Sequence, residues 1–186
     1  MNKPSQVPVW DLFIRLFHWL LVSTFIISWY TREEYYKLHL QAGYTVLGLI
    51  VLRIIWGLFG SKYARFSNFI YSPSSTISYM KTMFSAQAKR FIGHNPAAGM
   101  MILVLLLNLM TVTISGIALD GAENWSGPMA QMNLFKYMDL IQPIHKLSTD
   151  TLLILIGLHL CGVVYTSLVH RENLVRSMFN GRKRSL

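Results

Sequence analysis

The stretch that decides the fold is IHKLSTDTLLILIGLHLCGVVYTSLV, residues 144–169. As a helix it is long enough to cross a hydrocarbon core about 30 Å thick. His145 and His159 are fourteen residues apart in it, so their side chains fall within roughly 40° of each other on one helix face. A rise of 1.5 Å per residue separates them by ~21 Å along the axis, one near each side of the bilayer. Because imidazole is rare inside membranes, this helix predicts a functional site.

The composition places the rest of the chain in the same class. Of 186 residues, 53% are hydrophobic and only 13% are charged, against about 25% charged in soluble domains. We expect a single domain, residues 1–186, that is all-α and embedded in a membrane. The net charge of +9 does not indicate nucleic-acid binding, because the basic residues are dispersed between and after the apolar runs.

The apolar runs predict four transmembrane helices. Their expected bounds are about 11–30, 38–59, 96–119 and 144–169, with Asn95-Pro96 and Pro143 as the starts of the third and fourth. A surface helix is expected at about 74–91, because apolar residues recur there at helical spacing. This helix would either lie in the membrane interface against lipid or pack on the protein's own loops. Asp120 to Gln142 reads as a loop with one short helix.

The distribution of charge predicts the orientation. Of the 17 Lys and Arg residues, 13 lie on the side of the two termini and 4 on the other. The positive-inside rule therefore places both termini in the cytoplasm, and the expected fold class is a four-transmembrane-helix bundle. No signal peptide of the usual form is recognised at the N-terminus, so the first span is expected to be retained.

Four of the six histidines pair by depth. His39 and His145 open their spans on the outer side, whereas His18 and His159 lie toward the cytoplasm. Two imidazoles that face each other across a helix bundle are the usual axial ligands of a haem iron. We therefore predict two bis-histidine haem b groups. Cys161 is the single cysteine, which excludes a Cys-x-x-Cys-His attachment, so the haems would be held non-covalently.

Further residues fit this hypothesis less specifically. Gly43 is one turn from His39, where a missing side chain would let a macrocycle approach, although helix packing explains a glycine equally well. Arg53, Arg15 and Lys146 are candidates for pairing with haem propionates, with snorkelling to lipid phosphates as the alternative for the two arginines.

The two remaining histidines are poorer ligand candidates. His94 precedes a helix start in a polar loop, so we expect a capping or surface role. His170 shares a helix face with His159 but lies beside Arg171 at the membrane edge.

These residues resemble a known family. Five features together are similar to the bacterial di-haem cytochrome b family. They are Val9-Trp10-Asp11 with Arg15 and His18-Trp19, His39 with Gly43-Tyr44, Arg53 with Trp56-Gly57, Gly93-His94-Asn95-Pro96, and the His145/His159 spacing. That family includes cytochrome b-561 and the b-type cytochrome subunit of nickel-iron hydrogenases. The resemblance covers about residues 7–180. It implies that His18 and His159 hold one haem and that His39 and His145 hold the other.

The first functional hypothesis is electron transfer between the quinone pool and a partner, either a periplasmic c-type cytochrome or an oxidoreductase such as a hydrogenase. The alternative is an enzyme that oxidises superoxide and reduces quinone, with Arg32, Lys37, Lys136 and Lys146 attracting the anion, although nearby acidic residues offset that charge. A haem-free membrane anchor or transporter would leave the four histidines unexplained. The sequence leaves open the partner, the quinone, enzyme activity and a homodimer.

Overall fold

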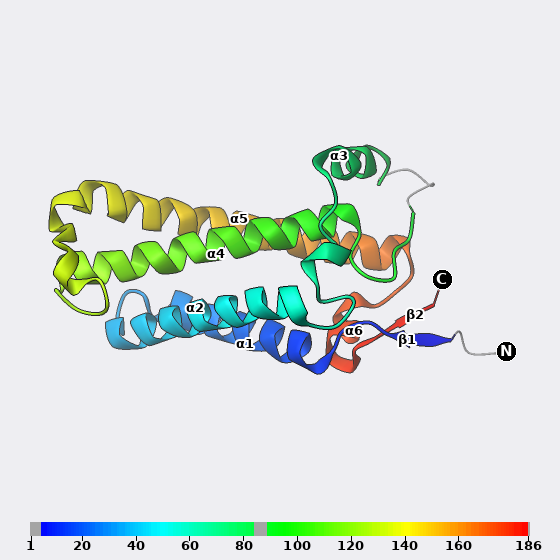
Figure 1. Ribbon diagram of the computed structural model, residues 1–186, viewed down its shortest axis with the longest axis horizontal. Coiled ribbons are helices and arrows are strands. Elements are labelled where there is room, and N and C mark those ends of the chain that lie inside the picture. The colour runs from blue at the N-terminus through cyan, green and yellow to red at the C-terminus, as the bar shows by residue number, and fades with distance from the viewer. Residues whose placement is uncertain (1–4, 84–88, 186) are drawn as a thin grey trace. The chain divides into compact units, whose positions relative to one another are not determined.

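The computed structural model describes residues 5–83 and 89–185. Within that part of the chain, four helices are long and apolar enough to cross a membrane (Figure 1). They are α1 (Leu12–Thr31), α2 (Tyr36–Phe59), α4 (Pro96–Glu123) and α5 (Met138–Val169). The predicted all-α class with four spans is confirmed. The shorter helices are α3 (Pro73–Thr82), in the region of the predicted surface helix, and α6 (Leu174–Asn180). The structure adds α6 and two short strands, β1 (Gln6–Pro8) and β2 (Arg182–Arg184).

The chain divides into two compact units. The first comprises Met1–Phe17, Arg53–Val104 and Ile156–Leu186, and the second comprises His18–Leu52 and Leu105–Leu155. Each of the four long helices therefore contributes one part to each unit. Within the spans, many large apolar side chains point outward, including Leu16, Leu20, Leu158 and Leu168. Such a surface is stable only against lipid or another apolar surface.

Asp11 organises the start of α1 in the first unit. Its Oδ1 accepts the backbone N–H of Ile14 at 2.8 Å, which is an N-cap. Its Oδ2 accepts the Trp56 indole N–H at 3.0 Å and the Ser61 hydroxyl at 2.5 Å. Burial alone would raise the pKa of the Asp11 carboxyl, but these hydrogen bonds hold it below its usual value. One carboxylate thus fixes the start of α1 against the end of α2.

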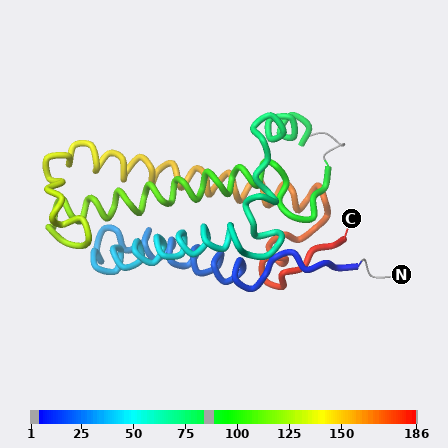
Figure 2. Tube along the Cα trace, viewed as in Figure 1, coloured from blue at the N-terminus to red at the C-terminus, as the bar shows by residue number. Residues whose placement is uncertain are grey.

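The first unit joins segments that are distant in sequence. Figure 2 shows the blue N-terminal and red C-terminal segments at the same end of the first unit. There β1 and β2 pair antiparallel, with Val7 opposite Lys183. Beside them Glu172 accepts from Arg90 at 3.0 Å and lies 3.5 Å from the buried Lys183 ammonium. Burial would raise the pKa of Glu172, but its N–H partner Arg184 and these two cations lower it. This ion-pair network joins the segment before α4 to β2 and to the turn after α5.

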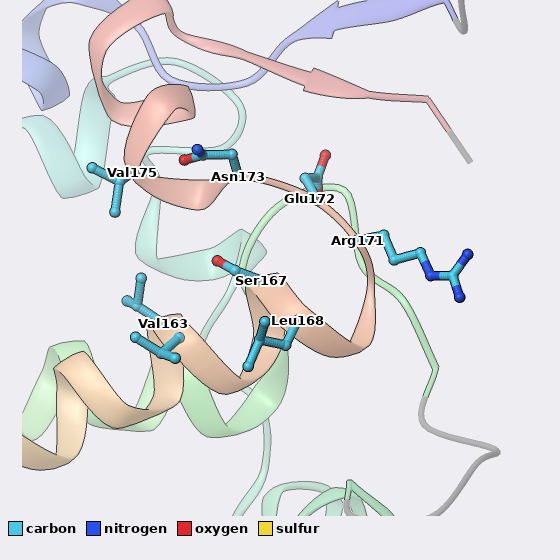
Figure 3. Close-up of a pocket in the computed structure, with 8 residues that line it drawn as sticks. Val163, Ser167, Leu168, Arg171, Glu172, Asn173 and Val175 are labelled. Carbon is cyan, nitrogen blue, oxygen red and sulfur yellow. The ribbon is translucent and has the colours of Figure 1, made fainter.

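The turn between α5 and α6 borders an open hollow. Its lining includes Val163, Ser167, Leu168 and Val175, and the Arg171 side chain points away from it (Figure 3). Asn173 caps α6 by accepting the Arg176 N–H at 2.7 Å. The hollow contains no histidine, so the predicted ligands do not lie here.

The core of the second unit consists of complementary helix stripes. α2 buries Ala42, Val46 and Ile50, which recur every four residues on one face. α4 buries Leu109, Thr113 and Ile117 at the same spacing. These stripes fix the rotation of α2 and α4 about their axes and so determine which way their polar residues point.

Two predicted span ends are wrong. α4 continues past residue 119 to Glu123, because Asp120 is buried and hydrogen-bonded instead of ending the helix in water. α5 begins at Met138 and contains Pro143, which does not open the helix. Proline is tolerated there because its missing N–H removes only one bond, to the first turn. The predicted short helix before α5 is two 3-10 helices, Ala130–Met132 and Leu134–Tyr137, separated at Asn133 by its left-handed backbone, φ 49°.

The predicted surface helix is shorter than expected. α3 ends at Thr82, residues 84–88 of the prediction lie outside the described part of the chain, and residues 89–91 are not helical. Phe91 packs instead against the ring of Tyr79, with centroids 5.6 Å apart. On α3 itself Ile77 and Met80 are half exposed. A location in the membrane interface stays a prediction.

Candidate functional site

The second unit brings two of the predicted ligands close together. His39 of α2 and His145 of α5, here called the outer pair, have ring centroids 6.5 Å apart and ring planes inclined by 86°. An imidazole nitrogen bonds a transition metal at about 2.0–2.1 Å, and its ring centre lies about 1 Å further away. Two rings on one iron would therefore have centres about 6 Å apart. The 6.5 Å separation of the outer pair is close to that requirement.

The hydrogen bonds of the outer pair favour the tautomer that a metal needs. His39 Nδ1 lies 2.8 Å from the Ser28 carbonyl oxygen of α1, and His145 Nδ1 lies 3.0 Å from the Val112 carbonyl oxygen of α4. A carbonyl only accepts, so each Nδ1 carries the proton. Each Nε2 is then an unprotonated donor atom for a metal. The two rings are thus oriented in the same way by two different helices.

Gly116 of α4 makes room for the outer pair. A Cβ at this position would lie 2.9 Å from His145 Cε1 and 3.3 Å from its Nδ1. Such contacts are closer than side chains tolerate, so a larger residue would move the imidazole. Sequence reasoning missed Gly116 as well as Ser28 and Val112. They could have been found only by working out, from the buried stripes, how each helix is rotated about its axis and which residues then face the histidines.

Gly43 follows His39 by one turn, as the sequence analysis noted. A Cβ there would meet no atom within 4 Å, so close packing between helices does not explain this glycine. Open space beside one ring of the outer pair is where a flat macrocycle needs room. Gly43 therefore remains a candidate for contact with the cofactor.

The other predicted pair is divided between the units. His18 lies at the start of the second unit, with its ring edge-on to Trp19, whereas His159 belongs to the first. Both imidazoles are partly buried. Their joint ligation of an inner haem stays a prediction.

The three candidate propionate partners differ in their surroundings. Arg53 is only 4% exposed, so it does not snorkel to lipid. Its Nη2 donates to the Ala64 carbonyl at 3.1 Å, and its buried Nη1 has no partner among the described residues. Arg15 donates to the Phe179 carbonyl at 2.5 Å, while Lys146 forms an exposed ion pair with Asp150 at 3.2 Å. Arg53 Nη1 and Arg15 Nε thus each remain a buried donor without a partner among the described residues, whereas Lys146 is already paired.

His94 is neither a cap nor a surface residue. Asn95 caps α4 by accepting the Ala98 N–H at 2.8 Å, while the His94 ring packs against Trp10 at 4.5 Å and Phe69 at 4.8 Å. Burial, followed by the nearby charge of Arg53, lowers the pKa of His94 to about 3. The expectation failed because a polar local sequence does not show that Trp10 covers the loop.

This depressed pKa predicts acid sensitivity. A histidine that ionises near 6.5 when unfolded and near 3 when folded contributes stability that is complete above pH 6.5 and declines as pH falls. Between pH 6.5 and 4.5 the free energy of unfolding should fall by about 2–3 kcal/mol. Asp11 and Glu172 act below that window, because their carboxyl pKa values are lowered. Thermal unfolding in detergent at several pH values measures the effect, and His94→Phe should reduce the dependence of stability on pH. His170→Gln is the control and should leave that dependence unchanged. An unchanged pH dependence in His94→Phe would contradict the attribution to His94.

Comparisons with known proteins place the chain in a family. The sequence profile of the family described as prokaryotic cytochrome b561 matches residues 9–181. A similar protein is the probable Ni/Fe-hydrogenase B-type cytochrome subunit of Rhizobium leguminosarum bv. viciae, 25% identical over 167 residues that cover 78% of this chain and 67% of that protein. No solved structure matches the chain.

Proposed function

Because the chain belongs to the prokaryotic cytochrome b561 family and is a membrane b-type cytochrome, we propose that it carries electrons between the quinone pool and a periplasmic redox protein. Membership implies haem b, electron transfer and a multi-pass location in the inner membrane. The proposal adds two haems: one held by the outer pair, the other by His18 and His159. The observation that carries it is the 6.5 Å separation of the outer rings.

The chain's own residues prepare the outer site for its cofactor. Ser28 and Val112 hold both Nδ1 protons, so the two Nε2 lone pairs need no proton release before they bind iron. When bound, haem b supplies a one-electron couple whose potential depends on its axial ligands and their hydrogen bonds. Backbone acceptors on two rigid helices hold both rings against rotation, which favours fast electron exchange with little reorganisation.

The partner is proposed by analogy and by chemistry. The relative from Rhizobium is described as a hydrogenase cytochrome subunit, so an oxidoreductase that docks on the outer side is the partner class we favour. A superoxide substrate is less well supported. Of the four basic residues it would need, Arg32 is paired with Glu33 at 3.1 Å and Lys146 with Asp150 at 3.2 Å.

Haem stoichiometry on the purified protein is the decisive test. We expect two haem b groups per chain by pyridine haemochrome, titrating in two steps, and reoxidation of the reduced protein by a soluble quinone analogue. One haem would overturn the two-haem proposal, and none would overturn the function. Oxidation of pulsed superoxide faster than spontaneous dismutation, without quinol-linked activity, would replace the proposal with the superoxide alternative.

A further inference from the structure

A buried carboxylate lies near the outer end of α4. Asp120 is only 3% exposed, although it is charged and lies in the last turns of a helix, where the helix dipole disfavours an anion. Its Oδ1 accepts the hydroxyl of Tyr36 and, at 3.3 Å, the side-chain N–H of Asn124. No cation among the described residues forms an ion pair with it. Retaining an uncompensated buried carboxylate is costly, which suggests a role beyond packing.

The helices place this carboxylate one turn from the outer pair. Gly116, which contacts the ring of His145, precedes Asp120 by four residues on α4. Tyr36, its hydrogen-bond partner, precedes His39 by three residues on α2. Both relations correspond to one helical turn, about 5 Å along the axis. All these residues belong to the second unit, so the carboxylate is the nearest buried acid that can respond to charge at the outer pair.

One oxygen of this carboxylate is an unused hydrogen-bond acceptor. Asp120 Oδ2 is buried and accepts no hydrogen bond from the described residues. It faces Gly127, where a Cβ would lie 3.1 Å from Oδ2 and 2.6 Å from the Tyr44 hydroxyl. Gly127 has φ +71°, a conformation that favours glycine, and any side chain there would collide with the Tyr44 hydroxyl. Oδ2 thus lies close to the Gly127 backbone and keeps an unused acceptor position for an O–H donor.

We propose that Asp120 is the proton-binding group of the outer face, taking up a proton at Oδ2 when an electron arrives between His39 and His145. This inference rests on the proposed function. An added electron makes the site more negative, and a nearby carboxylate answers by binding a proton. Tyr36 and Tyr44 of α2 and Glu123 of α4 are the other titratable groups around it, and none of them is a cation.

Quinol oxidation needs such a group. Each O–H bond that breaks in a quinol would release one electron and one proton. The outer pair would hold the haem that accepts the electron, and Asp120 Oδ2 would accept the proton and later release it to solvent. Oxidation of superoxide to dioxygen releases an electron and no proton. The O–H donor at Oδ2 is either the quinol hydroxyl or a water, and the experiment separates the two.

The test is a redox titration of quinone-free, haem-loaded protein at several pH values, followed by haem absorbance. In the wild type we expect the midpoint potential of one haem to fall as pH rises, because proton uptake accompanies reduction. In Asp120→Asn the potential should be higher and independent of pH. Glu123→Gln removes the same charge from an exposed position on α4 and should keep the slope.

An infrared reduced-minus-oxidised spectrum gives a second readout. The wild type and Glu123→Gln should gain a protonated-carboxyl band that Asp120→Asn lacks. If both haems remain bound, a wild type that is pH-independent and lacks this band both without quinone and with added quinol would overturn the inference, as would an Asp120→Asn variant with the wild-type slope. Loss of the outer haem in the wild type would instead overturn the proposed function. A response that needs no quinone identifies water as the donor, and one that appears only with added quinol identifies the quinol hydroxyl.

Discussion

Replacing either His39 or His145 with alanine is expected to halve the haem content and to remove the same haem in both variants. The rings face each other at 6.5 Å, and each is oriented by a separate carbonyl, so neither can substitute for the other. Loss of one axial ligand leaves a single imidazole, and non-covalent haem then dissociates or becomes high-spin.

The measurement is haem per protein together with the absorbance and spin state of the haem that remains. His170→Ala, which removes a histidine outside the proposed ligand set, should retain both haems. If His39→Ala and His145→Ala lost different haems, the pairing would be wrong, and His39 would have to be matched with His18 or His159.

Replacing Gly116 with valine should weaken the outer haem without touching a ligand. The new Cβ would lie 2.9 Å from His145 Cε1, so the ring must turn away from the Val112 carbonyl. Overpacking of this kind costs about 1–3 kcal/mol, which corresponds to a roughly 5- to 150-fold loss of affinity.

Haem retention during dilution in detergent measures this loss. Gly48→Val is the matched control, because a Cβ at Gly48 meets no atom within 4 Å in the same unit. Equal retention in the two variants would mean that His145 does not need the position that Gly116 allows.

The sequence predicts the four spans well because they depend on local periodicity. Long apolar runs specify α1, α2, α4 and α5, and the fourteen-residue spacing places His145 and His159 on one face of α5. The ends of α4 and α5 were mispredicted because their limits depend on tertiary partners. Asp120 looks like a residue in water until Tyr36 is known to bind it, and Pro143 looks like a helix start until the preceding turn is seen.

The surroundings of the ligands could not be predicted for a related reason. Ser28 and Val112 act through backbone carbonyls, which every residue has, so their identity carries no signal. His94 was misjudged because its burial depends on Trp10, more than eighty residues earlier in the chain. A sequence identifies a candidate histidine. The backbone carbonyls that bind its Nδ1–H and the side chains that bury its ring are known only from the fold.

The pairing of β1 with β2 imposes an order on biosynthesis. β1 is translated early and cannot pair until β2 has been synthesised. At about 5–20 residues per second, the ribosome reaches β2 roughly 9 to 35 s later. Until then the backbone N–H groups of Val9 and Trp10 lack the Gly181 carbonyl that they bind at 2.8 and 3.0 Å. The second unit, which ends at Leu155, is synthesised in full before this closure. All residues of the second unit, His39 and His145 among them, are therefore available to fold while the ends of the chain are still apart.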